Sequence, residues 1–259
     1  MILEFRPQLQ PVRDTVAYQV IWKLAFSGIL IYLTYFRKKK QTKGVKILMS
    51  AVACIPWLAV LAQNYKAVLS AVLVLQFFAI GYLVYSQLFH KKNSNLLLYT
   101  TMFLILFTMT GMGDYTFVNN SNGFQFWKVS LAVSVMAAVA ITVLVVKGYW
   151  KLKDDRVSEK VCLCILVTFF AFMISESALC HINYICDRTV PSVYELTVED
   201  KELETHSKGE TDYILKVRHK GRELEMEVSQ SDYYQYEIGD ELPVTFYEGF
   251  FEKEFYIVE

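Results

Sequence analysis

Six apolar stretches, each long enough or nearly long enough to cross a lipid bilayer, constrain the fold of this 259-residue chain most strongly. A hydrocarbon core of ~30 Å requires about 20 apolar residues in a helix. With 54% apolar and 20% charged residues, the composition is also typical of a membrane protein. We therefore predict an α-helical integral membrane bundle of six spans. The spans occupy residues 16–36, 45–62, 67–89, 96–112, 128–148 and 161–183.

The charges divide the chain into two parts of opposite sign. Residues 1–187 carry 18 Lys and Arg against 8 Asp and Glu, whereas residues 188–259 carry 8 against 18. We predict a six-helix transmembrane domain over residues 1–187 and an acidic soluble domain over residues 188–259. The first 14 residues have no apolar core and no small-residue cleavage site follows, so the first span is expected to be an uncleaved signal anchor.

The basic residues also predict an orientation. Thirteen positive charges fall in the connections at 37–46, 91–92 and 147–160, whereas the alternate connections hold two. Because Lys- and Arg-rich loops stay on the cytoplasmic side of a membrane, these connections are expected to be cytoplasmic. An even number of spans then places the N-terminus and the C-terminal domain outside the cytoplasm. The predicted location is a cell membrane, which the chain crosses several times.

Two charged residues fall inside predicted spans. Lys23 and Glu176 each lie about seven residues from an outer end, ~10 Å below the interface. An unpaired charge at that depth is costly, so we predict that Lys23 and Glu176 form an ion pair. Cys180 and Asn183 share the helix face of Glu176 by i, i+4 and i+7 spacing. Two alternatives remain open: a polar ligand or ion site that opens outward, or a snorkelling lysine with a structural carboxyl group.

Motifs for catalysis, metals and cofactors are not found. The segment GMGDYTFV resembles the second aspartate motif of intramembrane aspartyl proteases, but such enzymes need two membrane aspartates. The only aspartate upstream of Asp114 is Asp14, outside every span, so a chance match is favoured. Cys180 and Cys186 flank the outer end of the last span, where a disulfide is chemically permitted; free thiols are the favoured alternative. No metal ligand set, catalytic residue or cofactor is predicted.

The C-terminal part has the period-two pattern of half-buried strands. Apolar residues alternate with polar ones at 194–198, 213–217, 224–228, 242–246 and 255–257, with a hairpin turn at 219–222 and a helical turn within 229–237. Five short strands in about 70 residues predict an all-β domain of the OB or SH3 kind. Its acidic surface disfavours nucleic acid and favours a basic partner.

A resemblance adds to this pattern. The residues that carry it are Asn183-Tyr184, Asp187, Pro191, Val198–Lys201 and Tyr236–Asp240. They make the last 77 residues resemble the tail of uncharacterised bacterial multi-pass membrane proteins that end in a small β domain. The resemblance implies the fold and a bacterial membrane, and it assigns no activity to any residue.

The function predicted from these features is that of a non-enzymatic envelope module. The helices would anchor it in the lipid bilayer, and the β domain would bind, sense or assemble with a protein partner. The alternative is a transporter of a small solute or ion that uses Lys23 and Glu176. An enzyme that uses Glu176 or His181 is least favoured, because a single carboxyl group lacks the second group that most chemistry requires. The oligomeric state and the ligand are not indicated.

Overall fold

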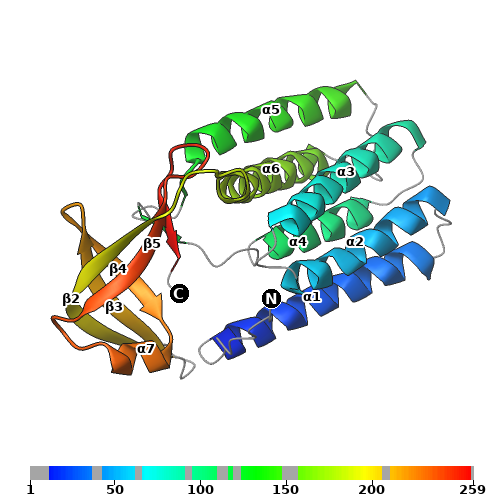
Figure 1. The fold of residues 1–259 in the computed structure, drawn as a ribbon. Helices are drawn as coiled ribbons and strands as arrows, with labels where there is room; N and C mark the ends of the chain where they lie inside the picture. Colours follow the sequence, from blue (N-terminus) through cyan, green and yellow to red (C-terminus); the bar gives the residue numbers. More distant parts are fainter. Residues whose placement is uncertain are drawn as a thin grey trace. The chain divides into compact units, whose positions relative to one another are not determined.

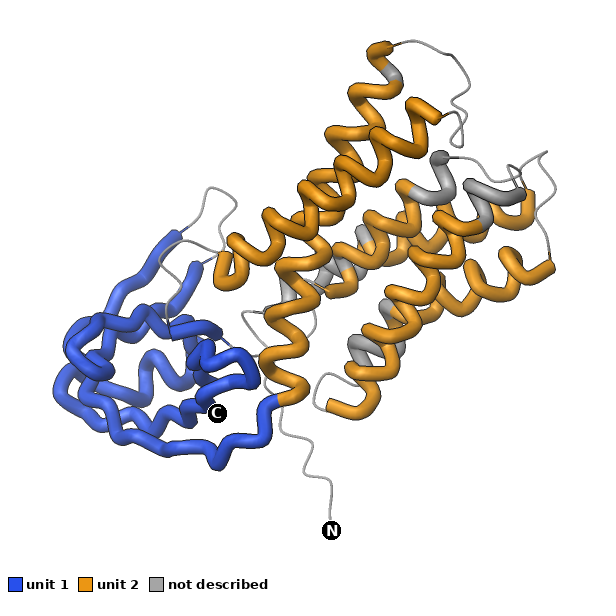
Figure 2. Tube along the Cα trace, turned by 90° about the horizontal axis from the view of Figure 1, so that it is seen from above, with its two compact units in different colours: residues 1–20, 115–120, 187–259 blue, residues 21–114, 121–186 orange. Residues whose placement is uncertain are grey.

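The computed structural model describes residues 12–36, 43–61, 66–90, 95–109, 116–118, 124–147, 157–205 and 211–257. The chain divides into two compact units, which Figure 2 shows in different colours. One unit is helical and contains Ile21–Asp114 and Ser121–Cys186. The other contains Met1–Val20, Tyr115–Asn120 and Asp187–Glu259, so it combines segments that lie far apart in the sequence.

Six long helices overlap the six apolar windows (Figure 1). They are α1 (Val12–Tyr35), α2 (Lys43–Leu61), α3 (Lys66–His90), α4 (Asn95–Met109), α5 (Trp127–Val146) and α6 (Val157–Ile185). Helix α5 packs chiefly against α6, α2 against α3, and α4 against α6. Three phenylalanines join α1, α4 and α6: the ring of Phe103 stacks on Phe26 at 5.4 Å and meets the edge of Phe170 at 4.6 Å, centroid to centroid.

The helices expose apolar side chains on their outer faces. Val74, Phe78, Met136 and Ile165 are each more than 60% exposed. Large apolar surfaces of this kind indicate contact with lipid or with another apolar surface. Three of the described helical segments are long and apolar enough to cross a membrane: Lys66–Tyr85, Trp127–Val146 and Lys160–Ile185. This supports a membrane location.

The prediction of six spans is therefore wrong. Helix α4 has 15 residues and is about 22 Å long, which is too short for the hydrocarbon core. The apolar part of α1, Lys23–Tyr35, is also too short, and α2 is not among the candidate spans. Hydropathy counts apolar residues, but it does not set the length of a helix. The described part of α4 ends at Met109, three residues before the end of the predicted window.

The second unit is built on a six-stranded sheet in the order β1-β6-β5-β2-β3-β4. The strands are β1 (Thr116–Phe117), β2 (Ser192–Thr205), β3 (Thr211–His219), β4 (Arg222–Val228), β5 (Glu241–Tyr247) and β6 (Phe255–Ile257). All neighbours are antiparallel. The long strand β2 pairs with β5 through residues 192–197 and with β3 from Val198 onwards. An irregularity between Val198 and Asp200 separates the two halves.

The five strands predicted from sequence are present, but the prediction of a five-stranded sheet is wrong. The sixth strand, β1, comes from the connection between α4 and α5 and pairs with β6. Two residues are too few for a period-two signal, so this strand is not recognisable from the pattern of apolar and polar residues. The strand order also leaves β1 and β4 at opposite edges of the described sheet, which is a half-barrel rather than the closed barrel that an OB or SH3 fold implies.

The sheet closes over its own apolar core. Val198, Leu215, Val217, Met226 and Val244 are fully buried, and they come from both halves of the sheet. The β3–β4 turn consists of Lys220 and Gly221, both with positive φ (51° and 77°), which is the pattern of a type I′ hairpin turn. This confirms the hairpin predicted at 219–222. The predicted helical turn is also present, as α7 (Gln230–Gln235).

Candidate functional site

The carboxyl group of Glu176 accepts two hydrogen bonds from the beginning of α5. The backbone N–H of Phe126 donates to Oε1 at 2.6 Å, and the hydroxyl of Ser130 donates to Oε2 at 2.7 Å. Glu176 is 5% exposed and Ser130 is completely buried. Phe126 is the N-cap residue of α5, and its own side chain makes no capping hydrogen bond. The cap is therefore supplied by α6.

This arrangement has a clear physical reason. The first N–H groups of a helix have no partner within the helix, and Phe126 and Glu176 are both buried, so water is kept away from this N–H group. The helix dipole also places partial positive charge at this end. A carboxylate that meets both an N–H group and a hydroxyl group satisfies the donors and interacts favourably with the dipole. Glu176 thus has a structural role in the helical unit.

A second residue of α6 meets the end of another helix. The Nε2 atom of His181 forms a hydrogen bond with the backbone carbonyl oxygen of Met109, the last residue of α4. Because a carbonyl oxygen only accepts, His181 is the donor. His181 is 5% exposed. Glu176 and His181 are five residues apart on α6. The carboxyl group of Glu176 accepts hydrogen bonds at the start of α5, whereas the ring of His181 donates one to the last described carbonyl group of α4.

The other predicted site residues lie in the same unit. Lys23 is 3% exposed, Asn183 is completely buried, and Cys180 is partly buried. The predicted ion pair between Lys23 and Glu176 stays a prediction; the partners established for Glu176 are Phe126 and Ser130. All five cysteines are free, Cys180 and Cys186 included. Asp114, which carries the protease-like motif, lies outside the described residues.

Sequence reasoning missed the partners of Glu176, although a signal was present. The residues before α5 read Phe124-Gln125-Phe126, with none of the Ser, Thr, Asp or Asn that normally cap a helix. A helix without a local cap, inside a membrane, needs one from elsewhere. Ser130 and Ser134, one turn apart in α5, are both small residues that suit helix packing. Ser134 does bond within its own helix, to the carbonyl oxygen of Leu131, so residue type alone does not distinguish the two serines.

One further polar side chain is buried among the helices. Gln76 of α3 is 1% exposed, and neither its amide nitrogen nor its amide oxygen has a hydrogen-bond partner. A buried amide group without a partner is costly. A glutamine in the middle of an apolar helix can form interhelical hydrogen bonds, but Gln76 forms none in the part of the chain that the structure describes.

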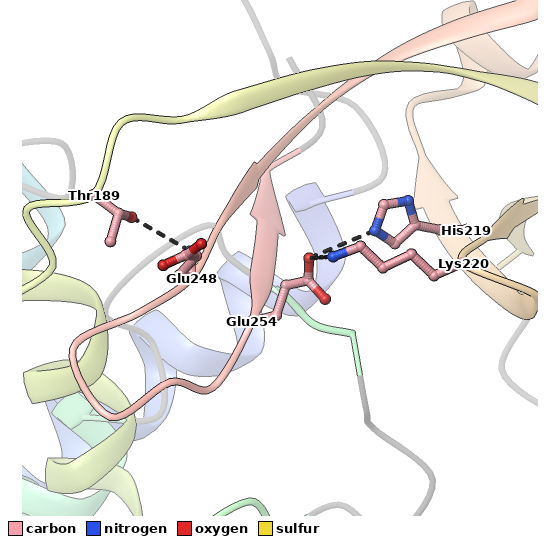
Figure 3. Close-up of polar contacts among 5 residues, drawn as sticks. All are labelled: Thr189, His219, Lys220, Glu248 and Glu254. Carbon is pink, nitrogen blue, oxygen red and sulfur yellow. Dashed lines mark hydrogen bonds and ion pairs between the residues drawn. The ribbon is translucent and has the colours of Figure 1, made fainter.

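The β unit contains its own charged cluster, shown in Figure 3. The ammonium group of Lys220 donates to Oε1 of Glu254 at 2.7 Å, and Nε2 of His219 lies 3.5 Å from the same oxygen. The His219 ring is 3% exposed and stacks on Phe246, with centroids 4.0 Å apart. The hydrogen bond with Glu254 raises the pKa of Lys220. This cluster joins the β3–β4 turn to the beginning of β6.

The outward face of β2, β3 and β4 is strongly acidic. The pairing places Asp200 beside Lys216 and Lys216 beside Glu225, and Glu202 and Glu227 flank Ile214 in the next row. Lys216 bonds to Glu202 at 2.7 Å and Arg218 to Glu199 at 3.0 Å. We call this surface the acidic sheet face. It carries two cationic residues, Lys216 and Arg218, and eight acidic ones. The acidic residues are Glu199, Asp200, Glu202, Glu204, Asp212, Glu223, Glu225 and Glu227.

Comparisons with family models, with curated proteins and with solved structures returned no match. The resemblance of the last 77 residues therefore stays a prediction. The described residues contain no group of three or more His, Cys, Asp or Glu that is arranged to hold a metal ion.

Proposed function

We propose that this protein is a membrane-anchored binding module whose acidic sheet face takes a cationic segment of a partner protein. The observation that carries the proposal is the register of β2, β3 and β4, which gathers eight carboxyl groups around two cations on one face. An excess of negative charge raises the local concentration of cationic partners and speeds their association. The adjacent strand β4 is at the edge of the described sheet, where an extended segment has backbone groups to pair with.

The proposal also places the β unit on the outer side of the membrane. This placement depends only on the hairpin of α5 and α6, both of which contain candidate spans. The connection between them contains Lys147, Lys151, Lys153, Arg156 and Lys160. If this connection is cytoplasmic, as the positive-inside rule favours, α6 delivers residues 187–259 to the outer side. The proposed location of residues 187–259 is the same for any number of spans before α5.

Photo-crosslinking in living cells tests the proposal. Ile214 lies in the middle of the acidic sheet face, so Ile214→benzoylphenylalanine places a probe there and leaves every charge in place. We expect a discrete adduct with another protein. The matched control is Tyr234→benzoylphenylalanine: Tyr234 is 61% exposed on α7 and lies off this face.

Charge reversal makes the test specific. Glu225→Lys with Glu227→Lys should remove most of the adduct at position 214. Glu237→Lys with Glu252→Lys changes the net charge equally, after α7 and between β5 and β6, and it should leave the adduct intact. The proposal is wrong if no adduct forms at position 214, or if both charge reversals weaken it equally.

Transport of a small solute or ion is the second candidate. The observation that favours it is the buried amide group of Gln76, which has no described partner in a bundle that also buries Lys23 and Glu176. Polar groups inside a membrane often line a solute pathway. Flux through reconstituted vesicles should then fall sharply with Gln76→Leu and with Glu176→Gln. Absence of flux for a panel of ions and small solutes would remove this candidate.

A further inference from the structure

The turn between β5 and β6 carries two exposed phenylalanines at its tip. The backbone N–H of Glu252 donates to the carbonyl oxygen of Gly249 at 3.0 Å, so Phe250 and Phe251 are the two central residues of the turn. Their side chains are 56% and 39% exposed, and their rings meet edge to face at 5.0 Å. Turn centres normally hold Gly, Pro, Asn, Asp or Ser. Two adjacent aromatic residues at the centre of a turn depart from this residue preference, and such departures are expected at functional sites.

The register places this turn at the end of the sheet where the chain arrives from α6. Ser192, near the start of β2, pairs with Phe246 near the end of β5. The backbone N–H of Glu248 also donates to the hydroxyl oxygen of Thr189 at 3.4 Å (Figure 3). This hydroxyl donates in turn to Asp187 at 2.8 Å. Asp187 follows the last residue of α6, Ile185, by two positions.

The chain leaves for α5 from the same end of the sheet. In β1, Phe117 pairs with Phe255 and Thr116 with Tyr256, so the end of β1 that leads toward α5 is the end nearest the turn. The backbone N–H of Val118 then donates to the carbonyl oxygen of Glu254 at 3.1 Å. Both connections to candidate spans, through α5 and α6, therefore begin beside the β5–β6 turn. Each residue spans at most ~3.6 Å, and Thr189 follows Ile185 by only four residues, so the turn is within reach of the bilayer surface if α6 spans it.

We propose that the β5–β6 turn inserts Phe250 and Phe251 into the headgroup region of the bilayer. Aromatic side chains favour this region. Val190, which is 87% exposed in the segment after α6, adds apolar surface at the same end of the sheet. The charges select the lipid. Glu254 is paired with Lys220, but Glu248 and Glu252 still outnumber Lys253 in the turn, so zwitterionic headgroups are favoured over anionic ones.

Photo-crosslinking of the full-length protein in phosphatidylcholine vesicles tests this contact. Phe250→benzoylphenylalanine keeps an aromatic ring at the tip. The matched control is Tyr234→benzoylphenylalanine, because Tyr234 has similar exposure but lies beside Tyr213 at the far end of the β2–β3 hairpin. We expect lipid adducts, identified by their mass, to be several-fold more abundant at position 250. Added phosphatidylglycerol should lower the yield.

Three outcomes overturn the proposal. Equal lipid yields at positions 250 and 234 mean that the tip has no special contact with lipid. A crosslinked dimer without lipid adducts means that the tip meets a second copy of the chain. No adduct at all means that the tip faces water. If the variant at position 250 fails to assemble, Phe251→benzoylphenylalanine carries the same test. None of these results depends on whether the acidic sheet face binds a partner.

Discussion

Replacing Glu176 by alanine should destabilise the helical unit, because two buried donors lose their acceptor. The N–H of Phe126 and the hydroxyl of Ser130 both donate to this carboxyl group. A buried donor left without a partner costs ~1–3 kcal/mol, whereas interhelical hydrogen bonds in membranes average only ~0.6 kcal/mol. We therefore expect a loss of about 2–4 kcal/mol in the free energy of unfolding.

The two serines of α5 provide a matched control. Ser130 and Ser134 are both buried one turn apart, but only the Ser130 hydroxyl donates to Glu176. Ser130→Ala should therefore cost more than Ser134→Ala. In a Glu176→Ala background this difference should disappear, because Ser130 no longer has its partner. The double-mutant cycle isolates the coupling between Ser130 and Glu176.

The measurement is reversible unfolding of the purified protein in detergent micelles with increasing denaturant, followed by circular dichroism. Hydrogen exchange at the amide of Phe126 gives an independent readout, since loss of its acceptor should speed exchange there first. The reasoning is refuted if Glu176→Ala costs no more than Ser134→Ala. It is also refuted if Ser130→Ala has the same effect in both backgrounds.

Three further predictions concern the β unit. Ser229 caps α7 by accepting from the N–H of Asp232, so Ser229→Ala should cost about 1 kcal/mol in thermal unfolding. Burial raises the pKa of Tyr256 to about 12, so its absorbance should titrate there. The folded pKa exceeds the unfolded value of about 10, so the contribution of Tyr256 to the free energy of unfolding is complete below pH 10 and falls between pH 10 and 12. Tyr256→Phe should abolish this pH dependence. A titration of Tyr256 near pH 10 would contradict the prediction. Glu254→Gln should lower the pKa of Lys220, measured by its rate of acylation against pH.

The sequence predicted local features of the β unit well. Alternation of apolar and polar residues located β2 to β6, because side chains in a strand point to opposite faces in turn. Lys220-Gly221 marked the hairpin, because residues that tolerate positive φ are needed there. The pairing of β1 with β6 lies beyond such reasoning. It joins residues 116–117 to residues 255–256, and nothing in either segment specifies the other.

The helical unit shows the same division. Hydropathy located six helices, but only three of the described helices are long and apolar enough to cross a bilayer. The depth of Glu176 in α6 predicted a buried carboxyl group in need of a partner. Lys23 was the predicted partner because it is the opposite charge at the same depth. A single sequence does not show that a backbone N–H group is the partner instead.

The sequence by itself determined the class of this protein: an apolar helical part with a basic connection before its last helix, followed by an acidic strand-rich part. These properties depend on composition and on periodicities of a few residues, which each segment carries alone. Only the tertiary structure decided which groups meet. Glu176 with the start of α5, His181 with Met109 of α4, and β1 with β6 all join segments that are more than 45 residues apart. Such contacts depend on how the whole chain packs.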